Sequence, residues 1–400
     1  MTSFPDVYIV GAARTPIGKF LGALSSLKAS DLGAIAIKEA MARAGIAGTE
    51  VDEVLMGHVV QGGQGQAPAR QAQIKAGIDP AVGAVTINKV CGSGLKAVML
   101  GAQAIKAGDA ECVVAGGQES MSTAPHYLFS GRTGQKLGDT TLKDGAVMDG
   151  LWCSFNDCHM IELAQYTAEK AKLTREELDR FSAESQRKAA DAIASCRFSK
   201  EIAPVTIAPR KGDPIVVSKD EAVRADTTLE ALAKLPAVTR AKDGVITAGN
   251  APGLNDGGAA LVLMSAARMK QKGAPPLARV VAYATGGGPP KELFFAPIDA
   301  VQKLMKKMGV TIGHFDLIEA NEAFAAQAVA DGQALGWDWS RVNVNGGAVA
   351  LGHPIGASGA RTLVTLLNAM QERGARIGVD SLCIGGGEAV AVAVELCYGQ

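Results

Sequence analysis

Short apolar runs alternate with stretches of helical periodicity along the first part of the chain. The strand-like runs occupy residues 7–12, 54–60, 84–90 and 111–115, and the helix-like stretches occupy residues 31–44, 67–76 and 93–107. An apolar run of this length indicates a buried strand, whereas apolar residues at every third or fourth position indicate an amphipathic helix. Regular alternation of the two predicts an α/β protein with a mainly parallel sheet covered by helices.

A second series with the same order follows toward the C-terminus. Strands are predicted at residues 278–284, 316–319, 341–345, 381–384 and 389–395, and helices at residues 298–308, 322–335 and 356–372. In both series a strand leads to a glycine-rich turn, a helix, and a strand that ends in glycines, at Gly116-Gly117 and at Gly385-Gly-Gly387. The repetition indicates an internal duplication, and strand ends of this kind are where α/β sheets bind ligands.

The stretch between the two series has a different character. Residues 120–247 are richer in charge and contain a helical segment at 173–197, which begins with a capping box formed by Thr174 and Glu177. An apolar run at 259–265 is predicted to be a strand that returns to the first series. We therefore expect an N-terminal half of residues 1–119 plus 248–272, an inserted loop domain of residues 120–247 that holds a cofactor or forms a lid, and a C-terminal half of residues 273–400.

Composition narrows the class of protein. The 400 residues carry 40 basic and 40 acidic side chains, so net charge gives no reason to expect nucleic acid or an anionic membrane as partner. No apolar run approaches the roughly 18 residues of a membrane span. The seven cysteines contain no C-x-x-C pair, which is typical of reduced thiols in the cytoplasm, and no leader segment is recognisable before the first strand. We expect a cytoplasmic enzyme.

Cys91 is the strongest candidate for chemistry. It follows a predicted strand and precedes Gly92-Ser-Gly94, where a helix begins. Unpaired amides and the helix dipole at such a position favour a thiolate over a thiol, and the glycines leave room for a carbonyl group to reach the sulfur. Taken alone, a structural cysteine is the more common explanation of this pattern.

Three further candidates lie in the second series, and one of them, Cys383, occupies a position comparable to that of Cys91. Cys383 ends a strand just before Gly385-Gly-Gly387, so its thiol is suited to proton transfer and the glycine amides to binding an anion. His353 lies in a glycine-rich loop before a helix, where an imidazole can activate a thiol or simply pack. Asn321 follows a strand, and its amide is suited either to holding a carbonyl oxygen or water, or to capping a helix.

A metal site has little support. Cys153, Cys158 and His159 supply three ligand types, but their spacing fits no common zinc site and no fourth ligand suggests itself. We expect no bound metal.

Several motifs together resemble the thiolase family. They are Val90-Cys-Gly-Ser-Gly94, Gly116-Gly-Gln-Glu-Ser-Met121, Asn321-Glu-Ala-Phe324, Gly352-His-Pro-Ile-Gly-Ala-Ser-Gly359 and Cys383-Ile-Gly-Gly-Gly387, and they occur in the family's order across nearly the whole chain. The pattern is most similar to that of the short acetyl-CoA acetyltransferases of the family. The resemblance implies duplicated βαβαβαββ halves that form a five-layered αβαβα core, with an inserted loop domain.

The resemblance also implies catalytic roles. Cys91 would take up the acyl group, and His353 would activate Cys91 and, with a water held by Asn321, stabilise the enolate oxygen of a second thioester. Cys383 would remove a proton from acetyl-CoA in synthesis and return it in cleavage. The backbone amides of Cys91 and Gly385 would bind the oxyanion.

The same resemblance implies where coenzyme A thioesters bind as substrates, with no permanently bound cofactor. The implied contacts are His159, Met160, Arg224, Ala248 and Phe324, the last of which would line the acyl site. The resemblance further implies a homodimer, or a homotetramer assembled through the region 120–148. It places the reaction, a reversible Claisen condensation of two acetyl-CoA to acetoacetyl-CoA and CoA, in fatty-acid metabolism.

The chain departs from the family pattern at several positions that bear on acyl-chain length and affinity for CoA. These are Ile161, Pro252, Phe294-Phe295 and Glu388. We expect Phe294 or Phe295 to narrow the acyl pocket.

Two alternative functions stay open at this stage. One is the degradative branch of the family, which cleaves longer 3-ketoacyl-CoA. The other is a non-catalytic protein that binds acyl-CoA esters on the same scaffold, and it predicts that a catalytic residue is missing, whereas all four are present. A ketosynthase-like enzyme, with one cysteine and two histidines, is disfavoured by the Cys383 motif.

Overall fold

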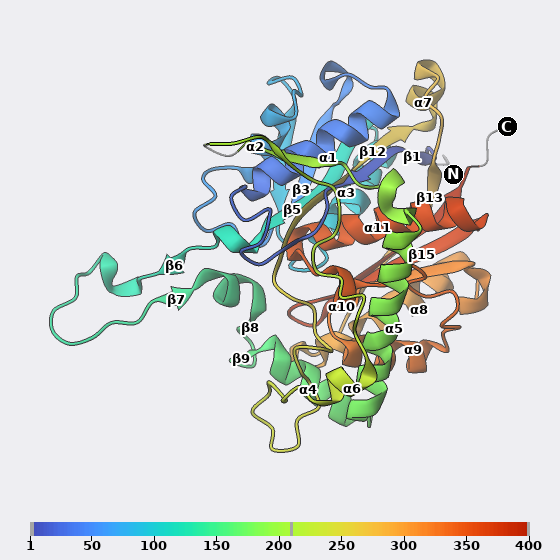
Figure 1. The fold of residues 1–400 in the computed structure, drawn as a ribbon. Coiled ribbons are helices and arrows are strands. Elements are labelled where there is room, and N and C mark those ends of the chain that lie inside the picture. The colour runs from blue at the N-terminus through green and yellow to red at the C-terminus, as the bar shows by residue number, and fades with distance from the viewer. Residues whose placement is uncertain (1–3, 209–210, 398–400) are drawn as a thin grey trace.

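The computed structural model describes residues 4–208 and 211–397, and a large mixed sheet runs through it (Figure 1). Among these residues the sheet has ten strands, in the order β14-β15-β16-β13-β1-β12-β5-β3-β4, with β2 paired to β12. The N-terminal strands are β1 (Val7–Arg14), β2 (Gly18–Lys19), β3 (Glu53–Gly57), β4 (Gly83–Ile87), β5 (Cys112–Ser120) and β12 (Asn255–Ser265). The C-terminal strands are β13 (Ala278–Gly287), β14 (Leu317–Ala320), β15 (Ile377–Ile384) and β16 (Glu388–Leu396).

Helices cover the sheet in separate layers. The N-terminal half contributes α1 (Ala29–Ala44), α2 (Pro68–Lys75) and α3 (Ser93–Ala107), and the C-terminal half contributes α8 (Ala296–Met308), α9 (Ala325–Leu335), α10 (Ala348–Leu351) and α11 (Ile355–Arg373). One apolar cluster joins α1 and α2 to one face of β1, β3, β5 and β12. Another joins α8 to the outer face of β13, β15 and β16.

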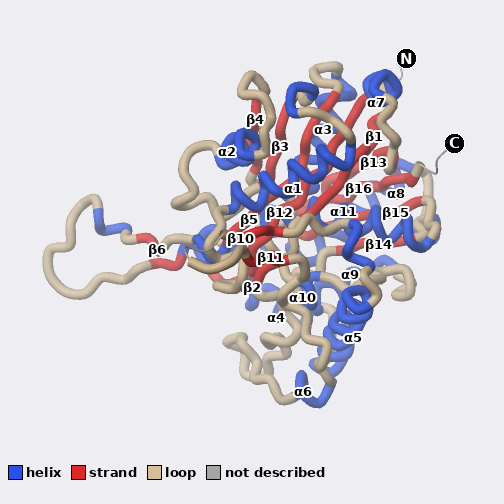
Figure 2. The backbone as a smooth tube through the Cα atoms, turned by 45° about the horizontal axis from the view of Figure 1, so that its top comes forward, coloured by secondary structure: helices blue, strands red, loops and turns tan. Residues whose placement is uncertain are grey.

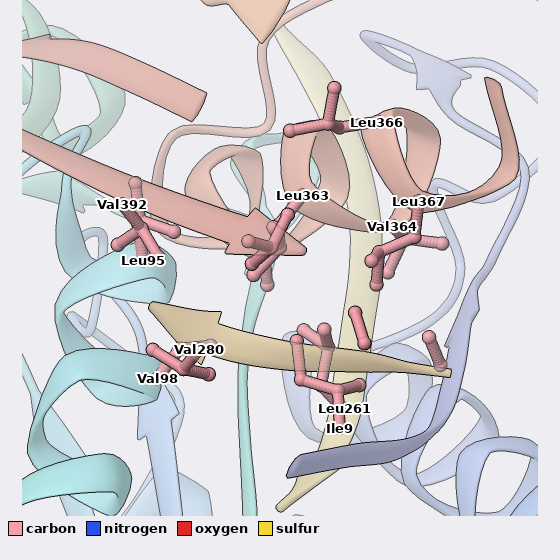
Figure 3. Close-up of a cluster of buried hydrophobic side chains, with 14 of the residues drawn as sticks. Ile9, Leu95, Val98, Leu261, Val280, Leu363, Val364, Leu366, Leu367 and Val392 are labelled. Carbon is pink, nitrogen blue, oxygen red and sulfur yellow. The ribbon is translucent and has the colours of Figure 1, made fainter. Parts of the chain in front are cut away.

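The central layer consists of α3 and α11. These helices lie between the strands of the N-terminal half and those of the C-terminal half, which we call the two half-sheets. Leu95 of α3 and Leu363 of α11 belong to one fully buried cluster with strand residues of both halves, such as Leu261 and Val392 (Figure 3). Burial of this kind contributes roughly 1.5–3 kcal/mol per large side chain. The resulting order of helix, sheet, helix, sheet, helix is the five-layered αβαβα core that the resemblance implies.

The half-sheets are not separate. A short antiparallel ladder joins β1 to β13, with Tyr8 opposite Arg279 and Ile9 opposite Ala278. Because of this ladder the two repeats share one continuous, twisted sheet (Figure 2).

The inserted region wraps around this core. It contains the hairpins β6 (His126–Tyr127) with β7 (Lys143–Asp144), β8 (Trp152–Cys153) with β9 (Cys158–His159), and β10 (Val205–Ile207) with β11 (Ile215–Val217). Its helices are α4 (Met160–Lys170), α5 (Arg175–Ala194) and α6 (Leu229–Ala233), and α7 (Ala266–Lys272) follows β12. The arm that carries β6 and β7 projects from the body (Figure 1). The predicted capping box at the start of α5 is present, with Thr174 as its N-cap.

Two predictions of secondary structure were wrong in detail. The segment 341–345 is not a strand but a loop, in which Val342 alone forms a bridge with Ile318. The helix expected at 322–335 begins only at Ala325, because Asn321 to Phe324 form the turn after β14. That turn is part of the site described next. Among the described residues, every helix is too short or too polar to cross a lipid bilayer.

Candidate active site

A cavity of about 350 Å³ is lined by residues of both halves and of the inserted region. Most of its lining is apolar, and the polar side chains that face it are those of Cys91, His159, His353 and Cys383. An apolar cavity with a few convergent reactive groups is the usual form of a small-molecule site. The structure thus brings together both predicted thiols and the predicted imidazole, from separate halves of the chain.

The turn before α3 fixes Cys91 in a strained backbone. Val90 adopts a φ of 44°, which is unfavourable for a β-branched residue. Ser93 holds this turn from both sides: its Oγ accepts the Lys89 amide at 2.8 Å and donates to the Val90 carbonyl at 2.6 Å. Cys91 therefore points from a rigid turn toward the cavity.

Glycine at position 92 allows the two halves to meet at this turn. A Cβ atom there would lie 2.4 Å from Ile384 Cδ1 and 3.2 Å from Val390 Cγ2. Any larger residue would push the turn away from β15 and β16. The glycine thus keeps Cys91 close to the strand that ends at Cys383.

Cys91 is a thiol in the free protein. Burial of the Cys91 sulfur away from bulk water raises the pKa of the thiol to about 12. The backbone amides of Gly385 and of Cys91 itself point at the sulfur and act in the opposite direction, lowering the pKa. Desolvation therefore outweighs the hydrogen bonds and favours the thiol over the thiolate that the start of α3 led us to expect. The two converging amides are nevertheless placed where an oxyanion beside the sulfur would form.

Cys383 lies at the end of β15 and is fully buried. Burial raises the pKa of its thiol well above the usual value, and the neighbouring Cys91 raises it further. This effect of Cys91 on the pKa of Cys383 agrees with the position of both side chains in the lining of one cavity. Cys383 also rests as a thiol.

His353 is held in one tautomer. Its Nδ1 lies 2.6 Å from Ser358 Oγ, and that hydroxyl donates to the Pro354 carbonyl at 2.9 Å. Since the hydroxyl proton is donated to Pro354, Ser358 Oγ accepts a hydrogen bond from Nδ1–H, which leaves Nε2 as the basic nitrogen. Burial, together with a smaller effect of the Arg361 charge, lowers the pKa of His353 to about 3, so the ring is neutral. Within the described part of the chain, Nε2 is buried without a partner.

Asn321 lies in the turn after β14 and is buried. Its backbone amide donates to the Ser381 carbonyl at 3.0 Å, which fixes the turn against β15. Neither polar atom of its side chain has a hydrogen-bond partner among the described residues, and Asn321 is not part of the cavity lining. A buried amide with open hydrogen-bonding capacity fits the expected role of holding a water.

Three of the five expected substrate contacts line the cavity: His159, Met160 and Phe324. His159 caps α4, and its Nδ1 accepts the Ile161 amide at 3.1 Å, so its Nε2 carries the ring proton. Burial lowers the pKa of this histidine, which is therefore neutral.

The other two expected contacts lie elsewhere. Arg224 is exposed in a separate hollow beside α5, and Ala248 is exposed outside the cavity lining. Neither contributes to the acyl cavity, and contact of either with the distal part of CoA stays a prediction.

The unusual residues cluster at the site. Ile161, Pro252 and Phe294 line the cavity, and the ring of Phe294 packs edge-on against Phe324 with centroids 5.3 Å apart. Phe295 lies outside the lining, so of the two phenylalanines only Phe294 is placed to narrow the pocket.

Two supporting residues were not singled out from the sequence. Ser358 lies one helical turn beyond Pro354, a spacing that could have indicated it. Glu119 is buried and accepts backbone amides of Val59, Val60 and Gly356, so it ties the N-terminal half to the start of α11. Its three partners come from distant segments, and no local pattern reveals them.

Comparisons with known proteins agree with the fold. The family descriptions "Thiolase, N-terminal domain" and "Thiolase, C-terminal domain" match residues 7–267 and 274–396. The chain is 54% identical to an acetyl-CoA acetyltransferase of Pseudomonas aeruginosa over 97% of this chain and 98% of that one. It is 52% identical to an Escherichia coli acetyl-CoA acetyltransferase, again over 97% of this chain and 98% of that one. A crystal structure of the Bacillus anthracis acetyl-CoA acetyltransferase superposes with a TM-score of 0.96 at 42% identity, covering 99% of this chain and 100% of that one.

The duplicated α/β core and a cavity with thiols from both halves define an enzyme class that transfers acyl groups through cysteine. Within that class, the chain belongs to the thiolase family.

Proposed function

We propose that this protein is an acetyl-CoA acetyltransferase, which condenses two acetyl-CoA to acetoacetyl-CoA and CoA and catalyses the reverse cleavage. The observation that carries the proposal is the convergence of Cys91, Cys383 and the basic Nε2 of a neutral His353 on one apolar cavity. Full-length relatives named acetyl-CoA acetyltransferase support the choice of substrate. Coenzyme A thioesters act as substrates, and no resident cofactor is needed for these steps.

Acylation begins with proton transfer from Cys91 to His353 Nε2. The Cys91 sulfur attacks the thioester carbonyl, and the amides of Cys91 and Gly385 receive the developing oxyanion. Loss of one such donor typically costs about 10²–10³ in kcat. CoA leaves as a thiolate and needs a proton. Cys383, a thiol at rest because burial raises its pKa, supplies that proton and becomes a thiolate.

Condensation uses the charges left by the first step. The Cys383 thiolate removes a proton from the methyl group of the second acetyl-CoA, and protonated His353, with a water held by Asn321, stabilises the enolate oxygen. The enolate carbon attacks the acyl group on Cys91. The Cys91 sulfur leaves and recovers its proton from His353, so every proton is accounted for and both cysteines end as thiols.

The unusual lining favours short acyl groups. Ile161 and Phe294 place bulky side chains in the cavity, and Phe294 is buried and fixed against Phe324. This packing favours acetoacetyl-CoA over the longer substrates of the degradative branch. Thiolysis measured across 3-ketoacyl-CoA lengths tests the assignment. We expect the highest kcat/KM with acetoacetyl-CoA, and a maximum at eight carbons or more would assign the protein to the degradative branch.

The setting of the enzyme is part of the same proposal. We place it in the cytoplasm, in fatty-acid metabolism, as a homodimer or homotetramer. Support for assembly comes from the projecting arm of β6 and β7, which exposes Leu128, Phe129, Leu137 and Leu142 (Figure 1). Exposed apolar groups of this kind mark interaction surfaces. Light scattering of the purified protein would distinguish monomer, dimer and tetramer.

A further inference from the structure

An ion pair links the two loops that carry the oxyanion-binding amides. Lys89 Nζ lies 2.6 Å from Glu388 Oε2, and the two residues come from opposite halves of the chain. Lys89 stands two residues before Cys91, and Glu388 stands three residues after Gly385. The side chain of Lys89 is 20% exposed and that of Glu388 is 47% exposed. The pair thus lies at the rim of the site rather than in its lining.

Both loops contain residues at positive φ, which is unfavourable for the β-branched Val90 and readily adopted by the two glycines. The loop of Cys91 contains Val90 at a φ of 44°, and the loop of Gly385 contains Gly386 and Gly387, each at a φ of 94°. Asn88 Oδ1 accepts the Val90 amide at 3.0 Å within the first loop, and in the second loop the Gly387 carbonyl accepts the amide of Gly288, just beyond β13, at 2.7 Å. None of these bonds connects one loop to the other.

The loops are connected by packing, by the Gly385 amide that points at the Cys91 sulfur, and by this ion pair between side chains. Gly92 packs against Ile384 and Val390, and Gly385 packs against Val90. Apolar packing is non-directional, so it limits how closely the loops approach without fixing how they slide along each other. The short contact between Lys89 and Glu388 adds a second directional tie, at the rim of the site.

We infer that Lys89 and Glu388 are a positioning pair that sets the separation of the Cys91 and Gly385 amides. Neither residue is part of the cavity lining. The inference rests on the proposed function, because it concerns the oxyanion formed in that reaction. Oxyanion donors act only within about half an ångström of their productive positions, so a small loss of register lowers the rate of acyl transfer. Surface ion pairs contribute little to global stability, so folding should be unaffected.

Four variants separate positioning from a direct effect of charge. They are Lys89→Met, Glu388→Gln, the double neutral variant, and the exchanged pair Lys89→Glu/Glu388→Lys. A matched control is Lys272→Met, which removes an ion pair of similar exposure between Lys272 and Glu50, 2.8 Å apart and outside the cavity lining. Thiolysis of acetoacetyl-CoA gives kcat and KM for each, and thermal unfolding gives the midpoint temperature. Activity of the unaltered enzyme tests the proposed function separately.

We expect Lys89→Met and Glu388→Gln each to lower kcat about tenfold with KM and midpoint temperature unchanged. The double neutral variant should be no worse than either single one, and the exchanged pair should recover at least half of the lost activity. If one single variant lowered kcat and the other raised it, the inference would be overturned. Such a result would indicate that the charges of Lys89 and Glu388 act on the reaction directly through their electrostatic field. Unchanged kcat in both, or losses equal to that of Lys272→Met, would also overturn it.

Discussion

Ser358 Oγ lies 2.6 Å from His353 Nδ1 and fixes which ring nitrogen of the histidine is basic. Replacing Ser358 with alanine removes the acceptor for the Nδ1 proton, so the ring can also adopt the tautomer in which Nε2 carries the proton. We expect Ser358→Ala to lower kcat by roughly tenfold to a hundredfold, with KM nearly unchanged. Steady-state thiolysis kinetics measure both constants.

The matched control for that variant is Ser182→Ala. Ser182 is equally buried and donates to the carbonyl one turn earlier, Leu178, at 2.7 Å, but it lies in α5 away from the cavity. Equal losses of kcat in the two variants would mean that Ser358 supports the fold and not the tautomer.

Alkylation of Cys91 should show the pH dependence of a desolvated thiol. Since burial raises its pKa to about 12, the thiolate fraction increases tenfold per pH unit throughout the neutral and mildly alkaline range. We expect the rate of iodoacetamide labelling to keep rising between pH 7 and pH 9.5, and acetyl-CoA to protect the residue. A plateau below pH 8 would reveal a preformed thiolate paired with His353.

Phe294 should control the length of the acyl group. Truncation in Phe294→Ala removes the ring that packs against Phe324, and each methylene that enters the freed space gains about 0.8 kcal/mol. We expect the ratio of kcat/KM for six-carbon over four-carbon 3-ketoacyl-CoA to rise roughly tenfold. Phe295→Ala is the control, because Phe295 lies outside the cavity lining. An unchanged ratio in Phe294→Ala would remove this residue as the gate.

Asp380 should make stability depend on pH. Burial raises its pKa to about 8, whereas the unfolded chain has the ordinary value of about 3.9. Between these values the folded protein binds a proton that the unfolded chain releases, so the free energy of unfolding falls as pH rises from about 4 to about 8.

Asp380→Asn keeps an acceptor for Thr362 Oγ1 and removes the titration. Urea unfolding at pH 6 and at pH 8 should show that the unaltered protein loses roughly 2–3 kcal/mol more than the variant over this interval. Parallel losses in the two proteins would show that Asp380 does not titrate there.

The sequence predicted the elements that hold the site because their signals are local. The helix at 93–107 was predicted with the bounds that α3 has, since glycines mark both of its ends. The alternation of strands and helices indicated the layered core, but the expected parallel sheet was wrong, because most neighbouring strands of the large sheet pair antiparallel. Matches to several motifs in order identified the family. The three-part division of the chain is not tested by these findings and stays a prediction.

Features that depend on distant contacts could not be predicted. The ladder between β1 and β13 joins residues of different repeats, and the segment 341–345 has the apolar pattern of a strand but finds only one bridging partner. The pKa of Cys91 depends on how much protein surrounds the sulfur, which the helix start alone does not reveal. For the same reason, only the fold shows that Phe294, and not Phe295, faces the cavity.

The division of labour between the two thiols is tested most directly by Cys383→Ala incubated with acetyl-CoA and examined by peptide mass spectrometry. We expect one acetyl group to accumulate slowly on Cys91, with no formation of acetoacetyl-CoA, because the proton-transferring thiol is gone while the nucleophile is intact. Cys112→Ala, which removes a buried cysteine outside the cavity, should behave like the unaltered enzyme. Condensation that persists in Cys383→Ala, or an acetyl group on any residue other than Cys91, would contradict these assignments.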